Sequence, residues 1–356
     1  MRPQDDNTLV KLGVSVGYWG FGVTAADQLD IARTAEQLGY DSVWTAEAYG
    51  SDGATVLAWL AAGTSTIKLG AGIFQIPARS AAMTAMTAAT IDQLSGGRML
   101  LGLGTSGPQV SEGWHGVRFA KQLQRTREYV AVVRMALAHQ KVEFHGETLE
   151  LPLPDGPGKV LKLTIRPVQD RIPIYLAVLG PKNVALAGEI ADGWLPVFFS
   201  PEHTAALRVP LEEGAARAGR SLDDFRICPS VNVMIGDDAA VARNAMRPVL
   251  GLYVGGMGSR EQNFYNRLVS SYGFEREAEQ VQELYLAGRK SEAMLALSDD
   301  LIDAVSIAGS PQRAKERLRA FADAGVETLI VSPMAFDNDE RKEQLRLVAG
   351  LAADLR

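Results

Sequence analysis

The chain has 356 residues, of which 47% are apolar and 22% charged, and its formal net charge is −6. This composition is close to the average of globular proteins, so fibrous and disordered classes are excluded. The acidic balance also argues against a nucleic-acid surface, because phosphate binding needs clustered Lys and Arg. We therefore expect a globular protein whose ligand is a small molecule.

The single cysteine, Cys228, excludes an intrachain disulfide and a cysteine-based metal cluster, which fits a reducing compartment. We expect it to be a small buried residue in a strand. The first residues are polar, without the apolar stretch of a signal peptide, and no segment approaches the roughly 18 uninterrupted apolar residues that span a bilayer. The sequence thus predicts a cytoplasmic protein with no membrane partner.

Short apolar runs alternate with helical patterns along the chain. In the first half, we expect strands at 11–17, 41–46, 67–73 and 98–104, and helices at 25–38, 53–63, 81–94 and 118–139. In the second half, we expect strands at 172–178, 193–197, 225–235 and 327–332, and helices at 183–190 and from 339 onward. Eight strands that alternate with helices predict an α/β fold, a closed parallel (β/α)8 TIM barrel formed by one domain over 1–356.

Two segments interrupt this alternation. Residues 140–168 contain short alternating patterns with Pro and Gly turns, which predict an inserted hairpin between the fourth helix and the fifth strand. Residues 251–301 begin with a Gly-rich stretch and continue as polar helical sequence. Because loops of this length usually surround an active site, we expect both insertions to cover the mouth of the barrel.

Three familiar motifs are incomplete, missing or out of their usual context. The run Gly102-Leu103-Gly104-Thr105-Ser106-Gly107 matches G-x-G-x-x-G, but it follows the fourth strand, and no acidic strand end follows about 20 residues later. Ser106 lacks the final glycine of a nucleophile elbow, since Pro108 stands there. The four histidines show no H-x-H or H-E-x-x-H pairing. A Rossmann site, a serine hydrolase and a metal-dependent hydrolase are therefore disfavoured.

Chemistry in a barrel of this type takes place where the strands end, at the carboxyl-terminal face. Four segments stand at the ends of predicted strands there: TAEAYG from 45, GIFQ from 72, TSG from 105 and LGPKN from 179. Together with DQLSGGRMLLGLG, EGWHG and GPKNVALAGEIADGWLP, they resemble the bacterial-luciferase-like superfamily. The chain is most similar to its F420-dependent oxidoreductases, of the mycobacterial and methylenetetrahydromethanopterin reductase types, from Lys11 to about Pro333.

The resemblance implies a set of cofactor-binding residues. The Gly72–Ile73 bond would be a cis peptide that backs the cofactor ring, and Glu47 would contact the deazaflavin. Gln75 and Ser106 are candidate hydrogen-bond partners of the ring or the ribityl chain. The complete predicted set is Glu47, Gly72, Ile73, Gln75, Thr105, Ser106, Gly107, Gly180, Pro181, Lys182 and Asn183. The last four open a helix, whose free N–H groups suit the cofactor phosphate.

The sequence departs from the F420-dependent sugar-phosphate dehydrogenases at both of their proton-transfer positions. Ala48 stands in place of a histidine, and Gly107 in place of a glutamate. Oxidation of glucose 6-phosphate is therefore rejected. Glu112 and His115 are the replacement candidates for a catalytic acid or base, since a histidine near neutral pKa can protonate a substrate. The alternative is that Trp114 packs and His115 has a structural hydrogen bond.

The resemblance implies an oxidoreductase that moves a hydride between C5 of coenzyme F420 and a small organic substrate. Two alternatives stay open: an FMN-dependent monooxygenase, and a non-catalytic F420-binding or carrier protein.

Family resemblance also implies a homodimer. No motif identifies the substrate. Aromatic residues near strand ends are candidates to line an apolar pocket: Tyr18, Trp19, Trp194, Phe198 and Phe199.

Overall fold

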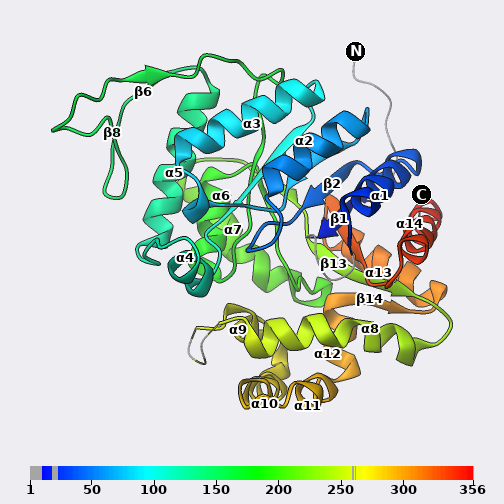
Figure 1. Cartoon of the computed structure of the whole chain (residues 1–356). Coiled ribbons are helices and arrows are strands. Elements are labelled where there is room, and N and C mark those ends of the chain that lie inside the picture. The colour runs from blue at the N-terminus through cyan, green and yellow to red at the C-terminus, as the bar shows by residue number, and fades with distance from the viewer. Residues whose placement is uncertain (1–9, 18–22, 259, 261, 356) are drawn as a thin grey trace.

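The computed structural model describes residues 10–17, 23–258, 260 and 262–355 of the chain. Its main sheet is parallel throughout and lies inside a ring of helices (Figure 1). Its strands are β1 (Lys11–Gly17), β2 (Ser42–Thr45), β3 (Lys68–Ala71), β4 (Phe74–Gln75), β5 (Met99–Gly104), β10 (Ile174–Leu176), β11 (Gly193–Trp194), β12 (Arg226–Ile227), β13 (Ser230–Ile235), β14 (Ser306–Gly309) and β15 (Thr328–Pro333).

The sheet closes on itself through the segment that contains β12 and β13. β12 pairs with β11 on one side, while β13 pairs with β15, which pairs with β1. The predicted strand over 225–235 is divided at Pro229, which lacks an N–H group for the ladder. Hydrogen bonds nevertheless continue across the division, from Cys228 N to Trp194 O at 2.9 Å and from Ile330 N to Pro229 O at 2.9 Å. The predicted (β/α)8 barrel is confirmed.

Several helices around the barrel begin at side-chain caps that the sequence supplies. Thr24 forms a capping box with Asp27, and Asp52 and Ser80 cap the next two helices. Helices α7, α8 and α13 and strand β14 were not predicted from the sequence. The surrounding helices are α1 (Ala25–Gln37), α2 (Gly53–Gly63), α3 (Ala81–Ser95), α5 (Gln122–Leu137), α6 (Pro181–Ile190), α7 (Thr204–Arg217), α8 (Ala239–Gly251), α13 (Pro311–Asp323) and α14 (Asn338–Ala353).

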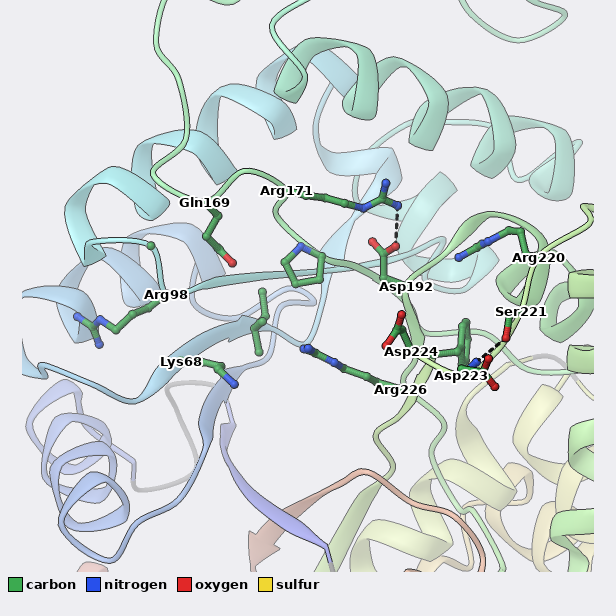
Figure 2. A pocket seen from close by; sticks show the side chains of 14 residues that line it. Lys68, Arg98, Gln169, Arg171, Asp192, Arg220, Ser221, Asp223, Asp224 and Arg226 are labelled. Carbon is green, nitrogen blue, oxygen red and sulfur yellow. Dashed lines mark hydrogen bonds and ion pairs between the residues drawn. The ribbon is translucent and has the colours of Figure 1, made fainter. Parts of the chain in front are cut away.

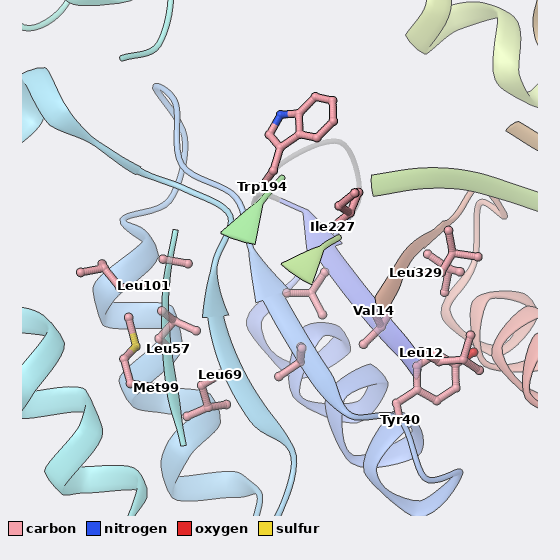
Figure 3. Close-up of a cluster of buried hydrophobic side chains, with 14 of the residues drawn as sticks. Leu12, Val14, Tyr40, Leu57, Leu69, Met99, Leu101, Trp194, Ile227 and Leu329 are labelled. Atoms are coloured by element: carbon pink, nitrogen blue, oxygen red, sulfur yellow. The ribbon is translucent and has the colours of Figure 1, made fainter. Parts of the chain in front are cut away.

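Two apolar layers hold the barrel together. Between strands and helices lies a large buried cluster that includes Leu57, Leu69 and Met99 (Figure 3). Inside the barrel, Trp44 and Tyr175 pack edge to face with their ring centres 5.5 Å apart. Cys228 is buried there, as predicted, although it lies between β12 and β13 rather than within a strand, and burial raises the pKa of its thiol. In the described part of the chain, no helix is both long and apolar enough to span a membrane.

The segment between α5 and β10 forms an arm of short antiparallel strands, as the sequence predicted. β6 (Lys141–Val142) pairs with β9 (Leu161–Lys162), and β7 (Phe144–His145) pairs with β8 (Glu150–Leu151). Its predicted position at the mouth is wrong. The arm joins the end of a helix to the start of a strand, so it lies at the amino-terminal face, away from α9 and α10 (Figure 1).

A buried carboxylate on α5 fastens this arm to the barrel. Glu128 accepts hydrogen bonds from the backbone N–H groups of Glu147, Thr148 and Leu149 at 2.7–2.9 Å, and from the Thr148 hydroxyl at 2.6 Å. Burial alone would raise the pKa of Glu128, but these bonds and one from Gln124 lower it to about 2. The ionised form is therefore the one that the fold stabilises.

We expect Glu128→Gln to lower the free energy of unfolding at pH 7 by about 2 kcal/mol, because charge-assisted hydrogen bonds are lost. The pKa is lower in the folded chain than in the unfolded chain, so this stabilisation is complete above the ordinary pKa of 4.5 and is lost as the pH falls toward 2. Urea unfolding between pH 7 and pH 3 should show the two proteins converging. Glu292→Gln, on an exposed pair with Arg289, is the control and should change nothing. A constant difference at all pH values would contradict this account.

The second insertion is a helical subassembly at the other face of the barrel. Two π-helical turns, Leu252–Gly256 and Ser270–Phe274, alternate with α9 (Phe264–Val269), α10 (Glu275–Leu286), α11 (Lys290–Leu295) and α12 (Asp299–Val305). These elements share a core with Phe198, and the Tyr272 hydroxyl donates to Phe198 O at 3.0 Å. Because Phe198 follows β11, this insertion lies beside the carboxyl ends of the strands, as predicted.

Candidate functional site at the carboxyl ends of the strands

The barrel brings four of the predicted segments to one rim. Thr45, at the end of β2, pairs with Ala71 of β3, and Gln75 of β4 pairs with Gly104 of β5. β5 in turn pairs with β10, which leads to Gly180. Residues that follow β2, β3, β5 and β10 are therefore neighbours at the same end of a parallel barrel, where such folds place their chemistry.

The centre of the rim is the turn between β3 and β4. The Gly72–Ile73 peptide bond is cis, which confirms the conformation that the resemblance predicted. Gly72 is exposed, and its N–H donates to Thr45 O at 2.8 Å. A Cβ on Gly104 would lie 2.3 Å from Ile73 Cδ1, so only glycine leaves room for that side chain. The backbone thus presents an open surface there; its place behind a cofactor ring stays a prediction.

Two polar side chains at this rim are buried with unused hydrogen-bonding atoms. Gln75 is 1% exposed, and its Nε2 donates to Ala48 O at 2.8 Å. Within the described residues, Gln75 Oε1 and Thr45 Oγ1 have no hydrogen-bond partner. Since buried polar atoms are rarely left unpaired, such a pair fits a site that a polar ligand completes. Gln75 was predicted; Thr45 was not, although its position at a strand end was available in the sequence.

Glu47 follows β2 as predicted, but its carboxylate is not free. Its Oε1 accepts from Arg79 Nη1 at 2.5 Å, and its Oε2 accepts from the N–H of Gly53 at 3.3 Å. The second bond ties Glu47 to the start of α2, since Gly53 is the first residue of that helix. Arg79 was missed because nothing in the sequence relates residues 47 and 79.

The segment after β5 is a tight turn into a short helix, α4 (Pro108–Gly113). Ser106 has a positive φ of 56°, and Gly107 is the residue that precedes the helix. Thr105 Oγ1 donates to Ser106 O at 3.4 Å, which is a long bond. The turn places these three residues beside the rim, and their contact with a cofactor stays a prediction.

The two acid or base candidates lie in and just after α4, in different surroundings. Glu112 is exposed and accepts from Phe119 N at 3.0 Å, so it holds the loop that follows the helix. His115 is half-buried, and among the described residues its Nε2 has no hydrogen-bond partner. Trp114 is 67% exposed, so the expectation that it packs is wrong. Of the two candidates, only His115 has a buried functional atom without a partner among the described residues.

The predicted phosphate segment opens α6. Gly180 has a φ of 76° and precedes the helix, whose first turn contains Pro181 and Lys182. Asn183 Nδ2 donates to Leu179 O at 3.1 Å, which fixes the turn. Lys182 is exposed and borders a hollow of about 340 Å³ between α5, α6 and α7. The positive end of the helix is available to an anion, as predicted, and no observation tests whether one binds.

Two of the aromatic candidates are buried in the main core, and a third packs against the helical insertion. Trp194 and Phe199 are both 1% exposed and belong to the main core, so the expectation that they line an open pocket is wrong. Phe198 packs edge to face on Tyr253 and Tyr265 of the insertion, at ring-centre distances of 5.5 and 5.9 Å. Tyr18 and Trp19 lie outside the described residues.

A cavity of about 590 Å³ opens at the opposite face, among the amino ends of β3, β5 and β12 (Figure 2). Many of its charges are already paired. Arg171 binds Asp192 at 2.7 Å, and Lys68 binds Asp41 at 2.8 Å. Arg98 donates to Ser95 O, Ile67 O and other oxygens nearby. This end of a barrel normally serves stability, so we do not place the functional site there.

Comparison with known proteins gives consistent matches over nearly the whole chain. The sequence model of the luciferase-like monooxygenase family matches residues 9–328. A Mycobacterium tuberculosis protein assigned by name as a coenzyme F420-dependent oxidoreductase is 43% identical over 330 residues, covering 91% of this chain and 95% of that protein. The 5,10-methylenetetrahydromethanopterin reductase of Archaeoglobus fulgidus is 30% identical, covering 89% and 91%. The structure of the coenzyme F420-dependent tetrahydromethanopterin reductase of Methanopyrus kandleri superposes with a TM-score of 0.82 at 26% identity, covering 96% and 97%.

Proposed function

Because the chain belongs to the luciferase-like monooxygenase family, we propose that it is an oxidoreductase that uses coenzyme F420. The observation that carries the proposal is the 43% identity, over nearly the full length of both chains, to a relative named for F420 dependence. The rim of the barrel supports it independently, since Gln75 and Thr45 present unused polar atoms beside the exposed Gly72.

The residues at the rim suggest a division of tasks. Gln75 Oε1 would accept a hydrogen bond from the polar edge of the cofactor. Gly72 and Ile73 would lie against one face of the cofactor ring. Ser106 would contact the chain that links ring and phosphate, and Lys182 with the first turn of α6 would hold the phosphate. When bound, coenzyme F420 supplies a carbon that gives or accepts a hydride. The protein contributes orientation and the exclusion of water.

The proposed proton donor is His115 rather than a carboxylate. Glu47 is engaged by Arg79 and by the start of α2, and Glu112 is engaged by the Phe119 N–H group. Both carboxylates therefore already accept hydrogen bonds within the protein. His115 Nε2 has no competing partner among the described residues, and imidazole can donate a proton near neutral pH.

Titration of the purified protein with F420 and, separately, with FMN tests the proposal. We expect F420 fluorescence to be quenched with a micromolar or lower Kd and FMN to have no effect. Binding of FMN alone would favour the monooxygenase alternative, and binding of neither cofactor would overturn the proposal. Turnover of reduced F420 with a panel of enones, imines and alcohols then distinguishes an enzyme from a carrier.

We also propose that the protein forms a homodimer through α2 and α3. Trp59 on α2 and Met83, Met86 and Leu94 on α3 are 49–62% exposed, and the α3 residues lie on one side of the helix. Exposed large apolar side chains on two neighbouring helices are typical of an interface. The cytoplasmic location predicted from the sequence stays a prediction.

Met86→Lys should convert the dimer to a monomer in analytical ultracentrifugation, because a two-fold interface would bury two added charges. Leu295→Lys, on the exposed surface of α11, is the matched control and should leave the mass unchanged. A wild-type protein that sediments as a monomer at micromolar concentration would rule out the dimer.

A further inference from the structure

Arg79 stands where three segments of the rim meet, four residues after Gln75. Its side chain is 12% exposed. Nη1 donates to Glu47 after β2, Nη2 donates to Asp52 at the start of α2, and the guanidinium lies 4.7 Å from the ring centre of Phe74 in β4. A single planar group thus joins the β2–α2 loop to the strand that follows the Gly72–Ile73 bond.

The backbone of Arg79 is fixed as firmly as its side chain. The Tyr129 hydroxyl of α5 donates to Arg79 O at 3.0 Å and lies 2.5 Å from Thr84 Oγ1 of α3. Burial raises the pKa of Tyr129 to about 12, so the phenol stays protonated and remains a donor at neutral pH. Arg79 is therefore anchored by two helices before it reaches the rim.

These contacts leave Glu47 little freedom. Its carboxylate is 8% exposed, with one oxygen on Arg79 and the other on the Gly53 N–H. A Cβ on Gly53 would lie 3.0 Å from Glu47 Oε2, so the absence of a side chain there permits the second bond. Each carboxylate oxygen keeps one further lone pair, which leaves Glu47 able to accept from a ligand in one fixed orientation.

We propose that Arg79 is a positioning residue of the cofactor site, which acts through Glu47 by holding its carboxylate toward bound F420. This inference rests on the proposed function. The fork of the guanidinium is needed because two carboxylates and an aromatic face must be contacted at once. A lysine ammonium carries the same charge, but it has no planar group to stack on an aromatic ring. It also has a single nitrogen with which to contact both carboxylates.

The test compares Arg79→Lys and Arg79→Ala with wild type, in F420 affinity by fluorescence and in thermal stability. We expect the Kd for F420 to rise about tenfold in both variants, the size of one lost charge-assisted hydrogen bond. Arg134→Ala is the control, because it breaks a comparable half-buried pair with Asp192 at the other end of the barrel. It should lower the melting temperature without changing the Kd.

A double-mutant cycle separates positioning from general stability. In a Glu47→Gln background, Arg79→Lys should change the Kd less than twofold, because the carboxylate through which it acts is gone. Unchanged F420 binding by Arg79→Lys, or equal effects in both backgrounds, would overturn the inference while leaving the proposed function intact. Failure of the wild type to bind F420 would instead refute the proposed function itself.

Discussion

Gly214→Ala should lower the free energy of unfolding by about 3 kcal/mol, against the ordinary preference of helices for alanine. Gly214 lies inside α7 where it crosses α6, and a Cβ there would be 1.8 Å from Ala185 O. The atom in the way belongs to the backbone, so no side-chain rotation relieves the clash. Because α6 opens with Gly180 and Lys182, separation of the two helices should also weaken cofactor binding.

Urea unfolding measures this effect, and Gly350→Ala is the matched control. Gly350 is likewise inside a helix, α14, but no atom lies within 4 Å of the position of its Cβ. Alanine there should stabilise the protein by up to about 1 kcal/mol, because it reduces the entropy of the unfolded chain. Equal effects at the two glycines would show that the crossing of α6 and α7 is not close-packed.

Gln75→Met should raise the Kd for F420 by ten- to a hundredfold while lowering the free energy of unfolding by only about 1 kcal/mol. The side chain keeps its length and burial, and the acceptor that is lost has no partner among the described residues. The side chain also donates one hydrogen bond, to Ala48 O, and the loss of that bond accounts for the small change in stability. The result depends on the proposed function, since the unused oxygen is assigned to the bound cofactor.

Gln344→Met is the control for this substitution. Gln344 is also buried, but its Oε1 accepts from Ile235 N at 2.7 Å and its Nε2 donates to Ile235 O at 2.9 Å. Removing it leaves two backbone groups unpaired and should destabilise the protein without changing F420 affinity. If Gln75→Met bound F420 normally in the same titration, Gln75 would not be a cofactor ligand.

The order and type of the main elements could be predicted because each carries a local signal. Helix α1 begins at the capping box of Thr24 and ends before Gly39, and the strands are short apolar runs. Three of the elements that were not predicted have weaker local signals. α7 contains Pro210, α8 contains Pro248, and β14 is a strand of only four residues. α13 was missed although Ser310 caps it and Pro311 opens it.

The sequence could predict which segments share the rim of the candidate site, but not the contacts between them. Strand ends place Glu47, Gln75 and Gly180 at one rim, since parallel strands share a direction. The ion pair between Glu47 and Arg79 depends on how two loops pack together, and no local sequence pattern predicts that packing. For the inserted arm, by contrast, the sequence did hold the information. The arm lies between a helix and the next strand, which fixes it at the amino-terminal face, but a general rule about long loops led us to expect it at the carboxyl-terminal face of the barrel.

Strand β13 belongs to the barrel and to the helical insertion at the same time. Residues 230–233 pair with β15 of the barrel wall, and residues 232–235 pair with β14, which returns from the insertion. The insertion is therefore joined to the wall by a ladder of backbone hydrogen bonds at its returning end. It cannot swing open as a rigid lid about flexible hinges, so any widening of the mouth must come from bending within the helices between α8 and β14.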